Sequence, residues 1–176
     1  MKEMKYLLVL VLVFMGCNSY NPSENIEKLY RENKSNRELK KFYGWHFNRR
    51  DYNSKKVFLV DNSGPGFYLC KYNDDIYELP IDIYQQFIET EGKEFTDGFI
   101  KQANIMLKII NIYDIYHVYS LDTLSIYFDF YKKDILVFSK LTGNELNLHI
   151  KKKFPNYFLY KKFDENWIWI KENEKK

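Results

Sequence analysis

The sequence predicts an α+β fold, with N-terminal and central helices packed on a mostly antiparallel sheet of hairpins. Residues 96–113 carry apolar side chains at helical spacing, which predicts an amphipathic helix. Most of the chain after residue 120 instead alternates apolar and polar residues, as half-buried strands do. Short turn-forming segments separate these runs, which is typical of antiparallel hairpins.

The sequence predicts helical structure before residue 45. Ser23 has the position of an N-cap, with Glu24 and Glu27 in the first turn that follows it. Ser35 and Glu38 fit a capping box, which predicts a helix that ends near Gly44. The polar residues between these two signals leave open whether the segment is one kinked helix or two.

The middle of the chain predicts a hairpin followed by two helices. Residues 56–61 and 67–72 are apolar runs on either side of a Gly-Pro-Gly turn, which is not a phosphate-binding loop because no Lys-Ser/Thr pair follows it. A short helix is expected at 81–90, and Thr96 is expected to cap a longer one. That longer helix carries an apolar stripe, expected to be core, of Phe99, Ala103, Met106, Ile110 and Tyr113. Its boundary with a following strand, between residues 112 and 119, stays open.

The C-terminal third reads as further antiparallel sheet. Alternation predicts strands at 124–131 and 135–139, and the pattern of Leu146, Leu148 and Ile150 predicts another. Residues 157–163 and 167–171 predict a closing hairpin.

The first 17 residues form a separate unit. Lys2 and Lys5 precede an uncharged apolar run at 6–15 that ends in Gly16-Cys17. A membrane-spanning helix needs about 20 apolar residues, so this run has the length of a signal-peptide core instead.

The Gly16-Cys17 pair resembles the lipobox of bacterial lipoproteins. Phe14 and Met15 replace the usual Leu and small residue, so the box is similar to the relaxed boxes of Bacteroidetes-type lipoproteins. The resemblance covers residues 1–17 and implies a signal peptide at 1–16, a lipid on Cys17, a tether at 17–23 and a location in the cell envelope, with the outer membrane as the expected site. The alternatives are a cleaved secretory signal and an uncleaved N-terminal anchor.

Composition limits the function of the remaining 160 residues, in which residues 24–176 are expected to form a single domain. Without Lys2, Lys5 and Glu3 the chain has 25 basic and 23 acidic residues, so no strong global charge would attract nucleic acid. The chain has two cysteines, so a lipid on Cys17 leaves Cys70 without a disulfide partner.

No pattern in the sequence predicts catalysis. His46, His117 and His149 are far apart and none forms a zinc-binding pair. Ser63 lacks a nucleophile-elbow motif, and Cys70 lies within an expected strand, which favours a small buried apolar role. We therefore expect a non-catalytic protein without a cofactor or metal.

Two sets of residues are candidates for binding. Trp167 and Trp169 share one face of an expected strand, with Tyr157 and Tyr160 across the hairpin, so they would form a platform for sugar rings or a protein; packing in the core is the favoured alternative. If the N-terminal helix is continuous, one of its faces carries four basic residues: Arg31, Lys34, Arg37 and Lys41. This face could contact anionic headgroups of the membrane, although a face exposed only to solvent is the favoured interpretation.

The expected function is that of a lipid-anchored envelope lipoprotein that binds a protein partner or has a structural role. An immunity lipoprotein that neutralises a toxin is one alternative, and an acidic face around Glu89, Glu91, Glu94 and Asp97 that plugs a cleft would favour it. A carbohydrate- or peptidoglycan-binding module is the other, favoured by an exposed tryptophan ledge.

Overall fold

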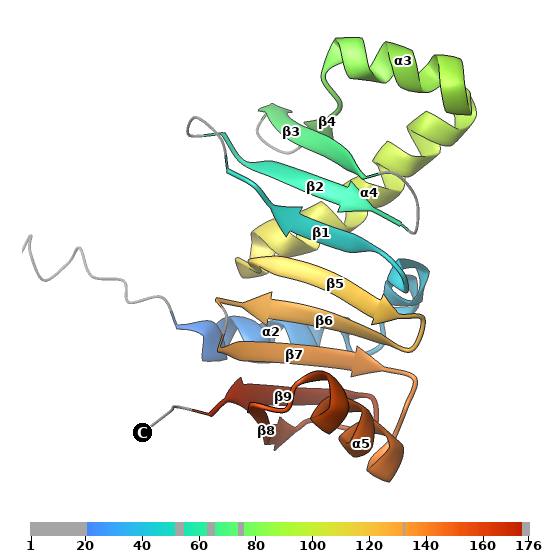
Figure 1. The fold of residues 1–176 in the computed structure, drawn as a ribbon. Helices are drawn as coiled ribbons and strands as arrows, with labels where there is room; N and C mark the ends of the chain where they lie inside the picture. Colours follow the sequence, from blue (N-terminus) through green and yellow to red (C-terminus); the bar gives the residue numbers. More distant parts are fainter. Residues whose placement is uncertain (1–20, 52–54, 63–65, 74–75, 132, 174–176) are drawn as a thin grey trace, which may run out of the picture.

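The computed structural model describes residues 21–51, 55–62, 66–73, 76–131 and 133–173. Its centre is a nine-stranded, all-antiparallel sheet with the order β4-β3-β2-β1-β5-β6-β7-β9-β8 (Figure 1). The predicted α+β class, with N-terminal and central helices and a sheet of hairpins, is confirmed. The predicted signal peptide, Cys17 and most of the predicted tether lie outside the described residues.

One end of the sheet is a meander of four strands: β1 (His46–Arg49), β2 (Val57–Asp61), β3 (Phe67–Asn73) and β4 (Ile76–Glu78). The predicted hairpin is the β2–β3 pair, with Val57 opposite Cys70. Two helices follow, α3 (Ile81–Glu91) and α4 (Lys93–Tyr113), and they return the chain behind the sheet to start β5 beside β1 (Figure 1).

The other end of the sheet holds β5 (His117–Asp122), β6 (Ser125–Phe130), β7 (Asp134–Ser139), β8 (Tyr157–Lys162) and β9 (Trp167–Glu172). The last strand, β9, lies between β7 and β8, so β8 forms the sheet edge. The predicted closing hairpin is confirmed as the β8–β9 pair. The open boundary after the long helix falls at Asp114, which has a left-handed backbone and ends α4.

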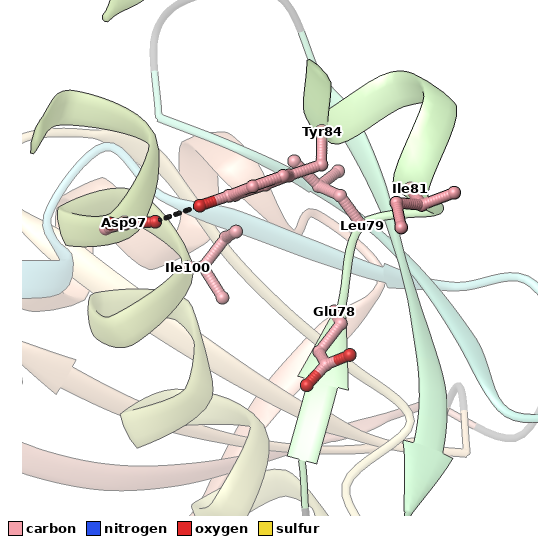
Figure 2. Close-up of a pocket in the computed structure, with 6 residues that line it drawn as sticks. All are labelled: Glu78, Leu79, Ile81, Tyr84, Asp97 and Ile100. Atoms are coloured by element: carbon pink, nitrogen blue, oxygen red, sulfur yellow. Dashed lines mark hydrogen bonds between the residues drawn. The ribbon is translucent and has the colours of Figure 1, made fainter. Parts of the chain in front are cut away.

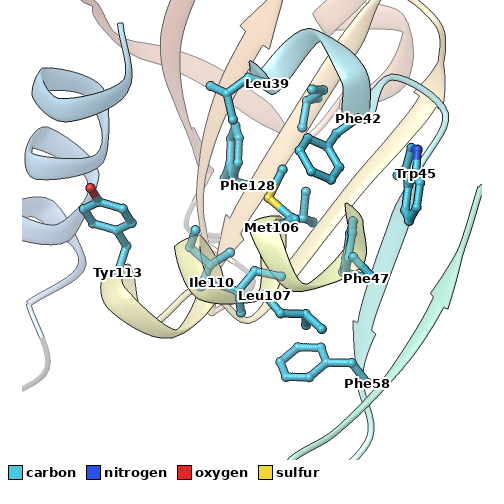
Figure 3. Packing of buried hydrophobic residues seen from close by; sticks show 14 of the residues in the cluster. Leu39, Phe42, Trp45, Phe47, Phe58, Met106, Leu107, Ile110, Tyr113 and Phe128 are labelled. Carbon is cyan, nitrogen blue, oxygen red and sulfur yellow. The ribbon is translucent and has the colours of Figure 1, made fainter. Parts of the chain in front are cut away.

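Helices cover both faces of the sheet. On one face lie α2 (Pro22–Asn33), the 3₁₀ helix η1 (Arg37–Phe42) and α4 (Figures 1 and 3). Their buried side chains join the main core, to which the predicted stripe of α4 contributes all five residues. The opposite face has a smaller core beneath α5 (Gly143–Lys153), where Leu146 and Ile150 meet Tyr127, Val137 and Ile168.

The predicted strand at 146–150 is wrong, because these residues form α5. Leu146 and Ile150 are four residues apart and both are buried, whereas Leu148 is 69% exposed. Three residues at positions i, i+2 and i+4 fit both a strand and one helical turn, and the lysines at 151–153 favour the C-terminus of a helix.

Several local details also differ from the sequence predictions. The N-terminal segment is two helices, and their caps are Asn21 and Asn36 rather than Ser23 and Ser35. Thr96 is not an N-cap, since α4 begins at Lys93 and the Thr96 hydroxyl donates to the carbonyl oxygen of Gly92 within the helix. Strand β1 was not predicted, because four residues without a clear alternation give no local signal and its pairing with β2 and β5 is non-local.

Candidate functional site

An acidic helical arm extends from the end of the sheet that carries β4. We define the acidic arm as residues 78–97, which comprise the end of β4, α3 and the start of α4. Figure 1 shows α3 beyond the sheet, while α4 passes behind it. No residue of α3 is buried, so this helix is held by contacts along one side only.

Aromatic contacts fix α3 against the sheet. The Phe87 ring of α3 meets Phe67 of β3 edge to face, with ring centroids 3.8 Å apart, and Phe67 in turn lies 5.3 Å from Phe99 of α4. Gly92 connects the two helices with φ at +85°, a conformation that side-chain-bearing residues rarely adopt. The angle between α3 and α4 is therefore determined by a glycine hinge and an aromatic cluster.

A hollow of about 590 Å³ lies at the base of the acidic arm, and we call it the arm pocket (Figure 2). Strand β4 and the segment after it contribute part of its wall, and the two arm helices contribute the rest. Its lining combines aliphatic and acidic side chains: Glu78, Leu79, Ile81, Tyr84, Asp97 and Ile100. Ile81 is 77% exposed, so a large aliphatic group at the pocket lies open to solvent. An apolar hollow with a few polar groups is the usual form of a binding site.

Tyr84 and Asp97 are the polar pair of the arm pocket. The Tyr84 hydroxyl donates to Asp97 Oδ1 at 2.6 Å and ties α3 to α4 across the pocket (Figure 2). This hydrogen bond, with smaller contributions from desolvation and from the Asp97 charge, raises the pKa of Tyr84 above its ordinary value. Tyr84 therefore stays protonated and remains a donor at neutral pH.

The acidic arm carries a concentrated negative charge. It contains a single lysine, Lys93, and six carboxylates. These are Glu78, Asp82, Glu89, Glu91, Glu94 and Asp97. All six residues are exposed, and within the described part of the chain none of them forms an ion pair. Carboxylates that form no ion pair with an internal cation leave their field available to an approaching cation. The acidic face around Glu89, Glu91, Glu94 and Asp97 is thus solvent-accessible.

Asn104 of α4 closes the sheet edge beside the pocket. Its side-chain oxygen accepts from the Tyr77 backbone N–H at 2.9 Å, and its amide nitrogen donates to the Tyr77 carbonyl oxygen at 2.8 Å. The carboxamide thus makes the two hydrogen bonds that a tenth strand would make with Tyr77. This pairing holds β4 on α4 and keeps the floor of the arm pocket in place.

The structure places the predicted tryptophan platform in the core. Trp167 is 1% exposed and Trp169 is 2% exposed, as the core interpretation predicts, so they form no exposed ledge. Trp169 Nε1 donates to Asp134 Oδ1 at 2.7 Å. Tyr160 is half exposed and meets Trp169 edge to face at 4.6 Å, whereas Tyr157 is half-buried beside the smaller core. The core therefore already covers the apolar surface of the two tryptophan rings that a sugar ring would have to contact.

The predicted basic set does not form one helical face, because α2 ends at Asn33 and η1 begins at Arg37. Arg31, Lys34, Arg37 and Lys41 are all exposed. Lys41 pairs with Glu38, whereas Lys34 and Arg37 line a pocket of their own.

Each histidine lies near an aspartate. His149 Nε2 is 3.2 Å from Asp122 Oδ2 and 2.9 Å from the Tyr127 hydroxyl, which anchors α5 to the sheet. Similar pairs join His46 to Asp61 at 3.5 Å and His117 to Asp129 at 4.0 Å. Among the described residues, no group of three or more His, Cys, Asp or Glu side chains could hold a metal ion.

Cys70 lies in β3 as predicted, but it is half-buried rather than buried, since β3 is near the edge of the sheet. Desolvation raises the pKa of its thiol against a smaller opposing effect of Lys55, so the thiol stays protonated and poorly nucleophilic at neutral pH.

The sequence indicates the acidic residues of the arm as a possible face, but it does not indicate the arm pocket. Part of the pocket could have been inferred from the sequence, since Glu78 and Asp97 flank an amphipathic segment. The proximity of these two residues, however, depends on how α3 folds back on α4.

No helix in the described ranges has both the length and the apolar character needed to cross a membrane. Comparisons with protein-family models, with curated proteins and with solved structures found no match to this chain.

Proposed function

We propose that this protein is a lipid-anchored protein of the cell envelope that binds a cationic protein partner through the acidic arm and is not an enzyme. The observation that carries the proposal is the combination, in one place, of an open aliphatic pocket and six carboxylates without ion pairs in the described chain. Protein interfaces use an apolar anchor in a pocket for affinity and surrounding charge for partner choice and association rate.

The expected partner presents basic residues around an apolar anchor side chain. Lys or Arg groups would pair with Glu78 and Asp97 at the pocket, and an aliphatic or aromatic side chain would contact Leu79, Ile81 and Ile100. Charge of opposite sign on the partner would raise the association rate, and salt would lower it.

An immunity function is a special case of this proposal, supported by the exposed acidic face on α3 and α4. It requires that the cationic partner is a toxin. Expressing the chain in cells exposed to the captured partner tests this directly, since an immunity protein would restore growth.

Photo-crosslinking tests the proposed interface. A photoreactive amino acid would replace Ile81 in the full chain, and in a matched control it would replace Leu148, which is similarly exposed on a different helix. The proposal predicts a discrete crosslinked protein from position 81 that is absent from position 148. Equal crosslinking at both positions, or none at 81, would contradict it.

The membrane anchor is tested separately with Cys17→Ala, with Cys70→Ala as the control. Lipidation of Cys17 predicts that the first variant leaves the membrane fraction and the second does not. A Cys17→Ala protein that stays in the membrane pellet would refute lipid anchoring while leaving the partner proposal intact.

A further inference from the structure

A second pocket lies away from the acidic arm, and its lining is basic. Its volume is about 490 Å³, and we call it the basic pocket. Three parts of the chain meet there: the segment from the end of α2 through η1, the end of β7, and the turn between β8 and β9. Its lining residues are Lys34, Ser35, Asn36, Arg37, Lys40, Tyr43, Phe138, Ser139, Lys140 and Asn166.

Four cations line the basic pocket: Lys34, Arg37, Lys40 and Lys140. None of them forms an ion pair with a carboxylate in the described part of the chain. Glu38 is the carboxylate within η1, and it pairs with Lys41 instead. Asp164, in the β8–β9 turn, accepts from the backbone N–H groups of Asn166 and Trp167. No ion pair within the described chain therefore neutralises these four side chains.

The frame of the basic pocket is held by hydrogen bonds. Asn166 Nδ2 donates to the Ser139 carbonyl oxygen at 2.8 Å and joins the β8–β9 turn to β7. Lys140 Nζ donates to the Thr123 carbonyl oxygen at 2.8 Å and lies 4.1 Å from the centroid of the Tyr43 ring. Asn36 caps η1 by accepting from the Glu38 backbone N–H. These contacts fix Lys140 and the chain around Arg37 before any ligand arrives.

Tyr43 also lines the basic pocket, and Lys140 lies over its ring. Its hydroxyl is buried and, among the described residues, has no hydrogen-bond partner. Burial raises the pKa of Tyr43 to about 12, so the hydroxyl carries its proton at neutral pH. A buried donor without an acceptor is uncommon in proteins.

We propose that the basic pocket binds a phosphate-bearing ligand, with Arg37, Lys34, Lys40 and Lys140 as its cationic contacts. One carboxylate would neutralise only one of the four cations, whereas a phosphate monoester or diphosphate carries two or more charges over several acceptor oxygens. The planar Arg37 fork matches two phosphate oxygens, and the lysines contribute point charges. This inference is independent of the proposed partner on the acidic arm.

The same phosphate chemistry has two sources, a small dissolved phosphate compound and a lipid headgroup. Helix α2 has 12 residues and is about 18 Å long, and Lys34 of the basic pocket follows its C-terminal end. Only four residues lie between Cys17 and α2, so the pocket and a membrane surface could be close to each other and the experiment must present both sources.

Calorimetric titration of the full chain in neutral detergent micelles tests the proposal, with sodium pyrophosphate as the probe. Saturable binding is expected. Each removed charge should weaken it about fivefold, so the Arg37→Gln/Lys40→Gln double variant should bind about 25-fold more weakly. The control double variant is Lys151→Gln/Lys152→Gln, on the exposed end of α5, and it should retain the parent affinity. Arg37→Lys keeps the charge but loses the fork, and should fall between the parent and the double variant.

Micelles doped with phosphatidic acid, a lipid whose headgroup is a phosphate monoester, distinguish the two sources. Competition with pyrophosphate supports a lipid headgroup as ligand, and unchanged pyrophosphate binding supports a dissolved phosphate compound. Absence of saturable binding to the parent would overturn the proposal, as would an equal loss of affinity in the two double variants. Circular dichroism of each variant checks that the exposed substitutions leave the fold intact.

Discussion

Replacing Asn104 with alanine is expected to lower the free energy of unfolding by about 1.5 kcal/mol. The substitution removes both hydrogen bonds to the Tyr77 backbone, of 2.9 and 2.8 Å, each with a net value of about 1 kcal/mol. Alanine returns about 0.6 kcal/mol because it is the better helix former. For a chain of this size the change corresponds to a fall in Tm of about 3 to 6 °C.

The assay is urea unfolding of the full chain, combined with hydrogen exchange at the Tyr77 amide. That amide should lose protection in Asn104→Ala, because its acceptor has gone. Lys108→Ala, at an exposed position of the same helix, is the control and should change the unfolding free energy by less than about 0.5 kcal/mol. If Asn104→Ala behaves like Lys108→Ala, the carboxamide does not close the sheet edge and the floor of the arm pocket is held in another way.

Three further predictions test the core. Trp169→Phe should destabilise the fold by about 1.5 kcal/mol more than Trp167→Phe in urea unfolding, because Trp169 Nε1 bonds to Asp134 and Trp167 Nε1 has no partner in the described chain; equal losses would argue against the Trp169 bond. Leu146→Ala should cost about 2 to 3 kcal/mol and Leu148→Ala less than about 0.5 kcal/mol, whereas a strand at 146–150 would make the two losses similar. The urea midpoint should fall between about pH 10 and 12, because tyrosines whose pKa rises in the folded state favour folding only while protonated. Three tyrosines have a pKa of about 12 in the folded protein: Tyr43, Tyr113 and Tyr127. If tyrosinate absorbance shows that these three side chains ionise near pH 10 in the folded protein, the prediction is contradicted.

Long periodic segments were predictable from the sequence. The stripe from Phe99 to Tyr113 spans four turns at one helical period, and all of its members are buried in the main core. The β2–β3 hairpin and the β8–β9 hairpin each combine two apolar runs with a short turn, so local information determines their pairing.

The elements that failed are those in which tertiary contacts decide. Leu146, Leu148 and Ile150 fit two periods over five residues, and burial against Tyr127 and Ile168 selects the helix. Strand order is also non-local, because β1 lies beside β5 only after α3 and α4 have returned the chain across the sheet.

The two pockets show the same limit at the level of function. The carboxylates of α3 and α4 were considered as a face that would favour an immunity function, but the aliphatic hollow between Glu78 and Asp97 arises from the turn at Gly92. Lys34 and Arg37 were predicted on a helix face, yet the break between α2 and η1 brings them beside Lys140, which is distant in sequence. Charge is visible in a sequence, but the cavity that the charge surrounds is not.

The salt dependence of the crosslink from position 81 tests the central proposal most directly. The yield of the partner adduct would be measured at low and high salt for the parent and for Glu78→Gln/Asp97→Asn, which removes two of the charges at the arm pocket. Recognition by the acidic arm predicts that salt lowers the parent yield steeply, and that the double variant starts lower and depends less on salt. The same yield in both proteins at every salt concentration would contradict recognition of a cationic partner by the acidic arm.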